Sequence, residues 1–132
     1  MLVEHVAFAV NDPEVAAAWY CRHLGMAIVR RGGGNDIFVA DGSGRVVFQL
    51  EDARLAYPNS GGKQLDFRAQ DPRVLHLGFV VEDVAAVRKR LLSAGATPDG
   101  EIMVTKDGDE MTAVRDPWGL CIQLVKRKNP FF

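Results

Sequence analysis

The chain has 132 residues, a formal net charge of −1, 48% hydrophobic residues and 25% charged residues. This length suits a single domain with its own hydrophobic core. The near-neutral charge gives no electrostatic reason to expect nucleic-acid or anionic-membrane binding, and no apolar run could cross a bilayer. Because the N-terminus also lacks a signal-peptide pattern, we expect a cytoplasmic protein that binds small molecules or a second copy of itself.

The first module, residues 1–51, has the pattern of a β-α-β-β-β unit. Alternating apolar residues predict a strand over 2–10, and Asp12 followed by Pro13 predicts the start of a helix that ends at Gly25. Three more strands, separated by glycine-rich turns, are expected at about 26–30, 37–40 and 45–51.

The second module, residues 73–126, repeats this order after a linker or flap over 52–72 that shows little periodicity. Its helix is expected to begin after Asp83 and to end at Gly95. The module is followed by a tail, 127–132. Its strands are expected at about 74–81, 101–105, 111–115 and 120–125.

Short motifs recur in the two modules. The segments that begin at His5 and His76 share the pattern His-x-x-Phe-x-Val-x-Asp, and the last strand of each module carries Gln-Leu, at Gln49 and Gln123. A repeat this long exceeds the usual solenoid unit. The chain is therefore predicted to be an internal duplication whose two modules form one domain, 1–132.

Strand alternation predicts where the repeated polar residues point. Successive side chains of a strand face opposite sides of the sheet, so both histidines should lie on the face away from the helix. Ala7 and Gly78, two residues beyond the histidines, are small and leave room for a ligand. The four polar side chains expected to line one cavity are His5, Gln49, His76 and Gln123.

These features resemble the vicinal oxygen chelate superfamily, which includes glyoxalase I, methylmalonyl-CoA epimerase, extradiol dioxygenases, fosfomycin-resistance proteins and bleomycin-binding proteins. The segment Asp116-Pro117-Trp118-Gly119 with Ile122-Gln123-Leu124 is similar to the Asp-Pro-x-Gly…Ile-Glu-Leu ending of that family. The resemblance implies an α+β fold in which paired βαβββ modules form curved, mostly antiparallel sheets around a central cavity, with one helix outside each. It also implies a homodimer.

In metal-using members of that family, the first and last strands of each module supply the metal ligands. The resemblance therefore implies a divalent ion, Mn, Fe, Co, Ni or Zn, bound by His5, Gln49, His76 and Gln123, and no nucleotide or organic cofactor. The chain departs from glyoxalase-like and dioxygenase-like relatives, which have glutamate where it has Gln123. With no carboxylate left in the set, the charge of the ion is not offset and no ligand can act as a base.

Two glutamates could supply the missing catalytic base. Glu51 shares a strand face with Gln49 and is the first candidate, and Glu110 is the second. The expected function is that of a metal-dependent lyase, isomerase or dioxygenase acting on a small molecule with adjacent oxygens.

A metal-free function remains as the alternative. In it, the cavity of a bleomycin-resistance-type protein holds an antibiotic or another hydrophobic ligand, and Tyr57, Phe67 and Trp118 line its pocket. A structural or regulatory dimer with a decayed site is a third interpretation.

Two other groups of residues give weaker signals. Cys21 and Cys121 lack metal-binding spacing and are expected to be reduced thiols. Basic residues gather around the linker, but acidic residues alternate with them, so little steering of an anionic ligand is expected. The basic residues are Arg54, Lys63, Arg68 and Arg73.

Overall fold

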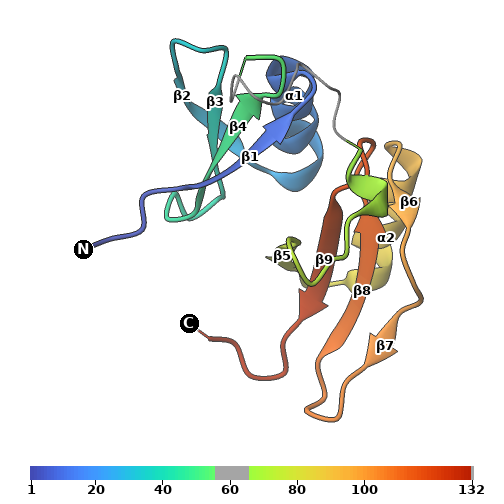
Figure 1. Cartoon of the computed structure of the whole chain (residues 1–132). Helices are drawn as coiled ribbons and strands as arrows, with labels where there is room; N and C mark the ends of the chain where they lie inside the picture. The colour runs from blue at the N-terminus through green and yellow to red at the C-terminus, as the bar shows by residue number, and fades with distance from the viewer. Residues whose placement is uncertain (56–65, 132) are drawn as a thin grey trace. The chain divides into compact units, whose positions relative to one another are not determined.

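The computed structural model describes residues 1–55 and 66–131 and divides the chain into two compact units, Met1–Leu65 and Asp66–Phe132. Each unit carries a helix and an open sheet, as the α+β expectation predicts (Figure 1). No helix among the described residues is long and apolar enough to cross a membrane.

The first unit contains five elements in the predicted order β-α-β-β-β. They are β1 (Val6–Val10), α1 (Pro13–Leu24), β2 (Ala27–Arg31), β3 (Ile37–Ala40) and β4 (Val47–Asp52). The strands are ordered β1-β4-β3-β2, and only the β1–β4 pair among them is parallel. Helix α1 packs against β3 and β4, which leaves the other face of the sheet for the site.

Local signals fix both ends of α1 as the sequence predicts. The Asp12 side chain accepts a hydrogen bond from the Val15 backbone N–H, and Pro13 stands in the first turn, where a missing N–H costs nothing. Gly25 ends the helix with φ of 69°, a left-handed conformation that glycine adopts without steric cost.

The second unit repeats this topology with one strand divided. Its elements are η2 (Phe67–Ala69), β5 (Leu77–Val80), α2 (Val84–Ser93), β6 (Thr97–Pro98), β7 (Met103–Val104), β8 (Glu110–Arg115) and β9 (Cys121–Lys126). The sheet order is β5-β9-β8-β6, with β7 also paired to β8. Helix α2 packs against β8 and β9.

The strand predicted over 101–105 is thus shorter than expected, and β6 was not expected. Both short strands pair with β8, so together they take the place that β2 has in the first unit. The division follows from Pro98, which ends β6 and has no N–H for the ladder, and from Gly100, which lies between the two strands with φ of 98°.

Both site histidines lie just before a strand, which corrects the prediction that they lie within one. Pairing of β1 with β4 begins only at Val6, opposite Phe48, so the predicted strand over 2–10 is too long. Similarly, β5 begins at Leu77. The residues from 74 onward were predicted to extend it, but Val74 N–H bonds to the Asp71 carbonyl in a turn.

The core of each unit lies between its helix and its sheet. Along β4, Phe48 and Leu50 are buried and Gln49 is half-buried, which confirms the predicted alternation. Leu124 of β9 is buried in the same way beside the half-buried Gln123. The glutamines therefore lie on the sheet faces opposite the helices.

Candidate functional site

In the first unit, His5 and Gln49 lie on one face of the sheet. Gln49 is paired with Ala7 on β1 and with Phe38 on β3, and side chains at paired positions share a face. The imidazole of His5 packs edge-on against Phe38, with ring centroids 5.6 Å apart. Phe38 thus contacts His5 and is paired with Gln49, which places the predicted histidine and the predicted glutamine on the same face.

The His5 ring is oriented by its neighbour in the chain. Nδ1 of His5 lies 3.1 Å from Oε2 of Glu4, and an ionised carboxylate can only accept a hydrogen bond. Nδ1 therefore carries the proton in the neutral ring, and the lone pair is on Nε2. That nitrogen is the one available to a metal ion or a hydrogen-bond donor.

Gln49 is oriented by Asp36, a residue that the sequence argument missed. Nε2 of Gln49 donates to Oδ2 of Asp36 at 2.9 Å, and Oδ1 of Asp36 accepts from the Gly34 backbone N–H at 3.2 Å. Burial acts to raise the pKa of Asp36, but these hydrogen bonds, with one from its own backbone, lower it overall. The charged carboxylate holds the amide nitrogen, so Oε1 is the end of Gln49 left for a ligand.

A cavity of about 190 Å³ extends from this contact along β4 and includes Glu51, the first candidate base. Glu51 is two residues beyond Gln49 on the same face. The cavity is lined by Gly34, Asp36, Gln49, Glu51, Asp52 and Leu55. Asp36 was identifiable in principle, because it precedes Phe38 by two residues and so shares its face.

In the second unit, His76 and Gln123 line one pocket of about 270 Å³, as predicted for this half of the site. Ala113 and Gly78, the register partners of Gln123, are both small and leave its amide room. No hydrogen bond to that amide is present among the described residues, so both of its ends can serve a ligand. The pocket is lined by Pro72, Arg73, His76, Asp99, Ala113, Cys121 and Gln123.

His76 repeats the arrangement of His5. Its Nδ1 lies 2.7 Å from the backbone oxygen of Pro72, which can only accept a hydrogen bond. The proton of the neutral ring is therefore on Nδ1, and the lone pair is on Nε2. Both predicted histidines thus have one nitrogen held by an oxygen acceptor and the other available.

Asp99 and Cys121 line this pocket and were not predicted as site residues, and Arg115 holds Asp99 in place. Arg115 is 14% exposed at its side chain and donates through Nε to Oδ2 of Asp99 at 2.6 Å. Cys121 is the register partner of Arg115, and burial raises the pKa of its thiol. No sequence signal separated Asp99 from other loop carboxylates, because its place depends on the division of the strand around it.

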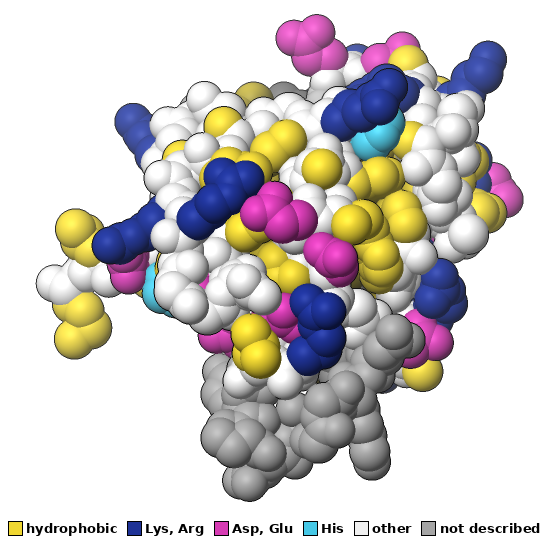
Figure 2. Space-filling view, turned by 90° about the horizontal axis from the view of Figure 1, so that it is seen from above, with side chains coloured by type: hydrophobic (Ala, Val, Ile, Leu, Met, Phe, Trp, Pro, Cys, Tyr) yellow, Lys and Arg dark blue, Asp and Glu magenta, His cyan; other side chains and the backbone are white. Residues whose placement is uncertain are grey.

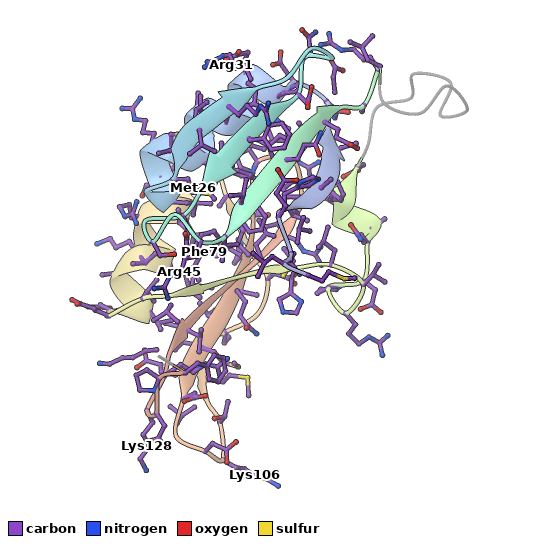
Figure 3. The ribbon with its side chains drawn as sticks, turned by 90° about the vertical axis from the view of Figure 1, so that its left-hand side faces the viewer. Met26, Arg31, Arg45, Phe79, Lys106 and Lys128 are labelled. Carbon is purple, nitrogen blue, oxygen red and sulfur yellow. The ribbon has the colours of Figure 1, made fainter. Side chains whose placement is uncertain are left out.

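Glu110, the second candidate base, is not brought to this pocket, so that part of the prediction is wrong. Ala113 faces the pocket, and Glu110, three residues away on β8, faces the other side of the sheet. It lines a separate cavity with Val104, Gly108, Lys126, Arg127 and Lys128, at the end of the unit where Figure 3 shows Lys106 and Lys128.

The weaker predictions have mixed outcomes. Tyr57 and Lys63 lie outside the described residues, and neither Phe67 nor Trp118 lines the pocket that contains His76. The other basic residues around the linker are each paired with an aspartate, in the pairs Arg54–Asp52, Arg68–Asp66 and Arg73–Asp71. Lys and Arg side chains are interspersed with Asp and Glu on the face shown in Figure 2, as the expectation of weak steering predicts.

The donor set is unusual for a metal centre. Within the described ranges, no group of three or more His, Cys, Asp or Glu side chains could hold a metal ion. The predicted set instead takes one histidine and one glutamine from each unit. Glutamine oxygen is a neutral ligand that suits hard divalent ions, and imidazole suits Zn, Fe and Ni.

Comparison with known proteins identifies the relatives of this chain. The sequence model of the Glyoxalase/Bleomycin resistance protein/Dioxygenase superfamily matches residues 2–124. A glyoxalase family protein from Bacillus cereus has a TM-score of 0.76 at 19% identity, with 96% of this chain and 93% of that chain covered. A lactoylglutathione lyase from Agrobacterium tumefaciens has a TM-score of 0.66 at 19% identity, with the same coverage of 96% and 93%. No curated protein matches the sequence.

Proposed function

Since the chain belongs to the Glyoxalase/Bleomycin resistance protein/Dioxygenase superfamily, we propose that it is a divalent-metal-dependent enzyme acting on a small molecule with adjacent oxygens. The proposed ligands are His5, Gln49, His76 and Gln123. One observation carries the proposal: Nδ1 of each histidine faces an oxygen acceptor, on Glu4 and on Pro72. Metal-binding histidines almost always have such a partner, which fixes the tautomer and directs Nε2 to the ion.

The surroundings of Gln49 support the same proposal. Asp36 holds the amide nitrogen, so the oxygen is the atom offered, as it would be from glutamate. The carboxylates of Asp36 and Glu51, which line the same cavity, add negative charge that the four proposed ligands lack. The residues therefore fit a divalent ion, although less tightly than a set with a carboxylate ligand.

A bound divalent ion would act as a Lewis acid on a substrate oxygen. The chain's own residues would bind and orient the substrate. The pocket beside Gln123 has the room that Ala113 provides, and polar groups of Asp99 and Arg73 stand at its wall. Glu51 remains the proposed base because it shares the face and the cavity of Gln49.

A metal-free binding protein is the second candidate function. The pocket that contains His76 is bordered by Pro72, Ala113 and the buried Cys121, and such mixed walls suit a small, partly apolar ligand. The Nε2 lone pair of His76 and the amide of Gln123 would then form hydrogen bonds with the ligand. For either function, a homodimer is proposed from the family resemblance.

Metal analysis of the purified protein tests the first proposal, with titrations of Mn, Fe, Co, Ni and Zn into the protein and two variants, His5→Ala and His76→Ala. The matched control is His23→Ala, because His23 lies in the last turn of α1 beside Trp19. We expect stoichiometric binding that either site substitution weakens strongly and the control leaves intact. Equal binding by all variants would contradict the ligand assignment, and no binding at micromolar metal would favour the metal-free function.

A further inference from the structure

We propose that Arg115 is a positioning residue for the second half of the site, acting on His76 through the backbone of residues 67–72. Its guanidinium holds this segment beside the end of β8, and the segment in turn supplies the carbonyl that orients the histidine. The inference rests on the proposed function only in that His76 is taken as a working group of the site.

The contacts of Arg115 are directed at backbone oxygens. Nη1 lies 3.3 Å from the carbonyl oxygen of Phe67, 3.2 Å from that of Gln70 and 3.2 Å from that of Gly119. Nε bonds to Asp99 at 2.6 Å. One guanidinium therefore joins η2, the loop after β8, and the pocket wall.

The segment leads directly from Arg115 to His76. Gln70, whose carbonyl Arg115 holds, stands two residues before Pro72, whose carbonyl accepts the Nδ1–H of His76 at 2.7 Å. The pyrrolidine ring fixes φ of Pro72 and restricts the conformation of Asp71 before it, which reduces the freedom between the two carbonyls. A shift of the Gln70 carbonyl would therefore move the acceptor that sets the tautomer of His76.

An arginine can hold Asp99 and the carbonyls together, because Nε bonds to Asp99 while Nη1 contacts the carbonyl oxygens. Its five N–H donors form a rigid fork, whereas a lysine ammonium is a compact group on a flexible stem. Asp99 offsets the charge of the guanidinium where it is largely buried. Arg115→Lys should therefore keep the ion pair and the fold but release some of the carbonyls.

The test measures the His76 tautomer by ¹⁵N NMR in metal-free protein, at a pH where the ring is neutral. For Arg115→Lys we expect a shift from the Nδ1–H form toward a mixture of tautomers. The matched control is Arg127→Lys, since Arg127 is also mostly buried and bonds to Asp109 at 2.6 Å, in the cavity with Glu110.

Metal titration of the same proteins gives a second measurement. Loss of an outer-shell contact to a ligand typically costs about 10–100-fold in metal affinity, and we expect this for Arg115→Lys only. An unchanged tautomer in Arg115→Lys, or equal changes in Arg115→Lys and Arg127→Lys, would overturn the inference. A wild-type protein that binds no metal would contradict the proposed function. The NMR measurement is made without metal, so it would still decide this inference.

Discussion

Asp36 accepts a hydrogen bond from Nε2 of Gln49 at 2.9 Å, which fixes which end of the amide a ligand can reach. The contact depends on a glycine, because a Cβ at Gly32 would clash with both carboxylate oxygens of Asp36. A Cβ added at Gly33 would meet open space, with no atom within 4 Å. Of these two neighbouring glycines, only Gly32 must lack a side chain for Asp36 to keep its position.

We predict that Gly32→Ala separates Asp36 from Gln49 and weakens metal binding by about 10–100-fold, the usual cost of losing an outer-shell contact. The carboxylate is at the end of a flexible side chain, so it can move aside at small cost in stability. Metal titration measures the effect. Gly33→Ala is the control and should bind as the wild type does; equal affinities for the two variants would remove Asp36 from the site.

A second pair of glycines tests the turn of the family-like motif. Gly119 and Gly100 have similar φ values, 100° and 98°, so alanine should bring similar backbone strain to both, about 1–2 kcal/mol. At Gly119, however, a Cβ would lie 2.6 Å from the backbone nitrogen of Arg68, whereas at Gly100 it would meet nothing within 4 Å.

We predict that Gly119→Ala lowers the free energy of unfolding by about 1–3 kcal/mol more than Gly100→Ala, the usual range for overpacking. Urea denaturation measures both values. Equal losses would mean that the segment around Arg68 moves aside without cost. The glycine of the motif would then be required for its φ alone.

The sequence predicted the sheet faces because alternation and repetition do not depend on tertiary contacts. Gln49 and Gln123 lie on the faces opposite the helices, and Leu50 and Leu124 are buried, as the period of two requires. The helix ends were predictable for the same reason, since the Asp12 cap is a local signal.

The residues that the sequence missed depend on distant partners. Arg115 bonds to carbonyls of residues 45 or more positions earlier in the chain, Phe67 and Gln70, and no local pattern indicates such contacts. Asp99 reaches the pocket because the strand around it is divided. Glu110 was misplaced because the sequence did not show which face of β8 borders the pocket; Ala113 lines it, and Glu110 lies on the opposite face.

We predict that the two cysteines differ in reactivity. Burial raises the pKa of the Cys121 thiol, so less of the reactive thiolate is present at a given pH, and the side chain is also shielded. Cys21 on α1 is half-buried. Iodoacetamide at neutral pH should label Cys21 first and Cys121 only after denaturation, as mass spectrometry of peptides can show. Rapid labelling of native Cys121 would contradict its burial beneath the pocket.

The buried Asp52 should make the free energy of unfolding depend on pH in the acid range. Hydrogen bonds from the Arg54 side chain hold the pKa of Asp52 well below its usual range, although burial alone would raise it. The lowered pKa means that the unfolded chain binds the proton first as pH falls. The stabilisation is therefore complete above the unfolded pKa of about 3.9 and is lost progressively as pH falls below it.

We predict that Asp52→Asn lowers the free energy of unfolding by about 1–3 kcal/mol at neutral pH, because an amide has one acceptor oxygen and no charge, so the bonds donated to the other carboxylate oxygen are lost. The difference from the wild type should stay constant above about pH 5 and shrink below about pH 4, as urea denaturation across this range would show. Asp83→Asn is the control, since asparagine caps a helix as well as aspartate does. A difference that grew as pH fell would have the wrong sign for a carboxylate stabilised in its charged form.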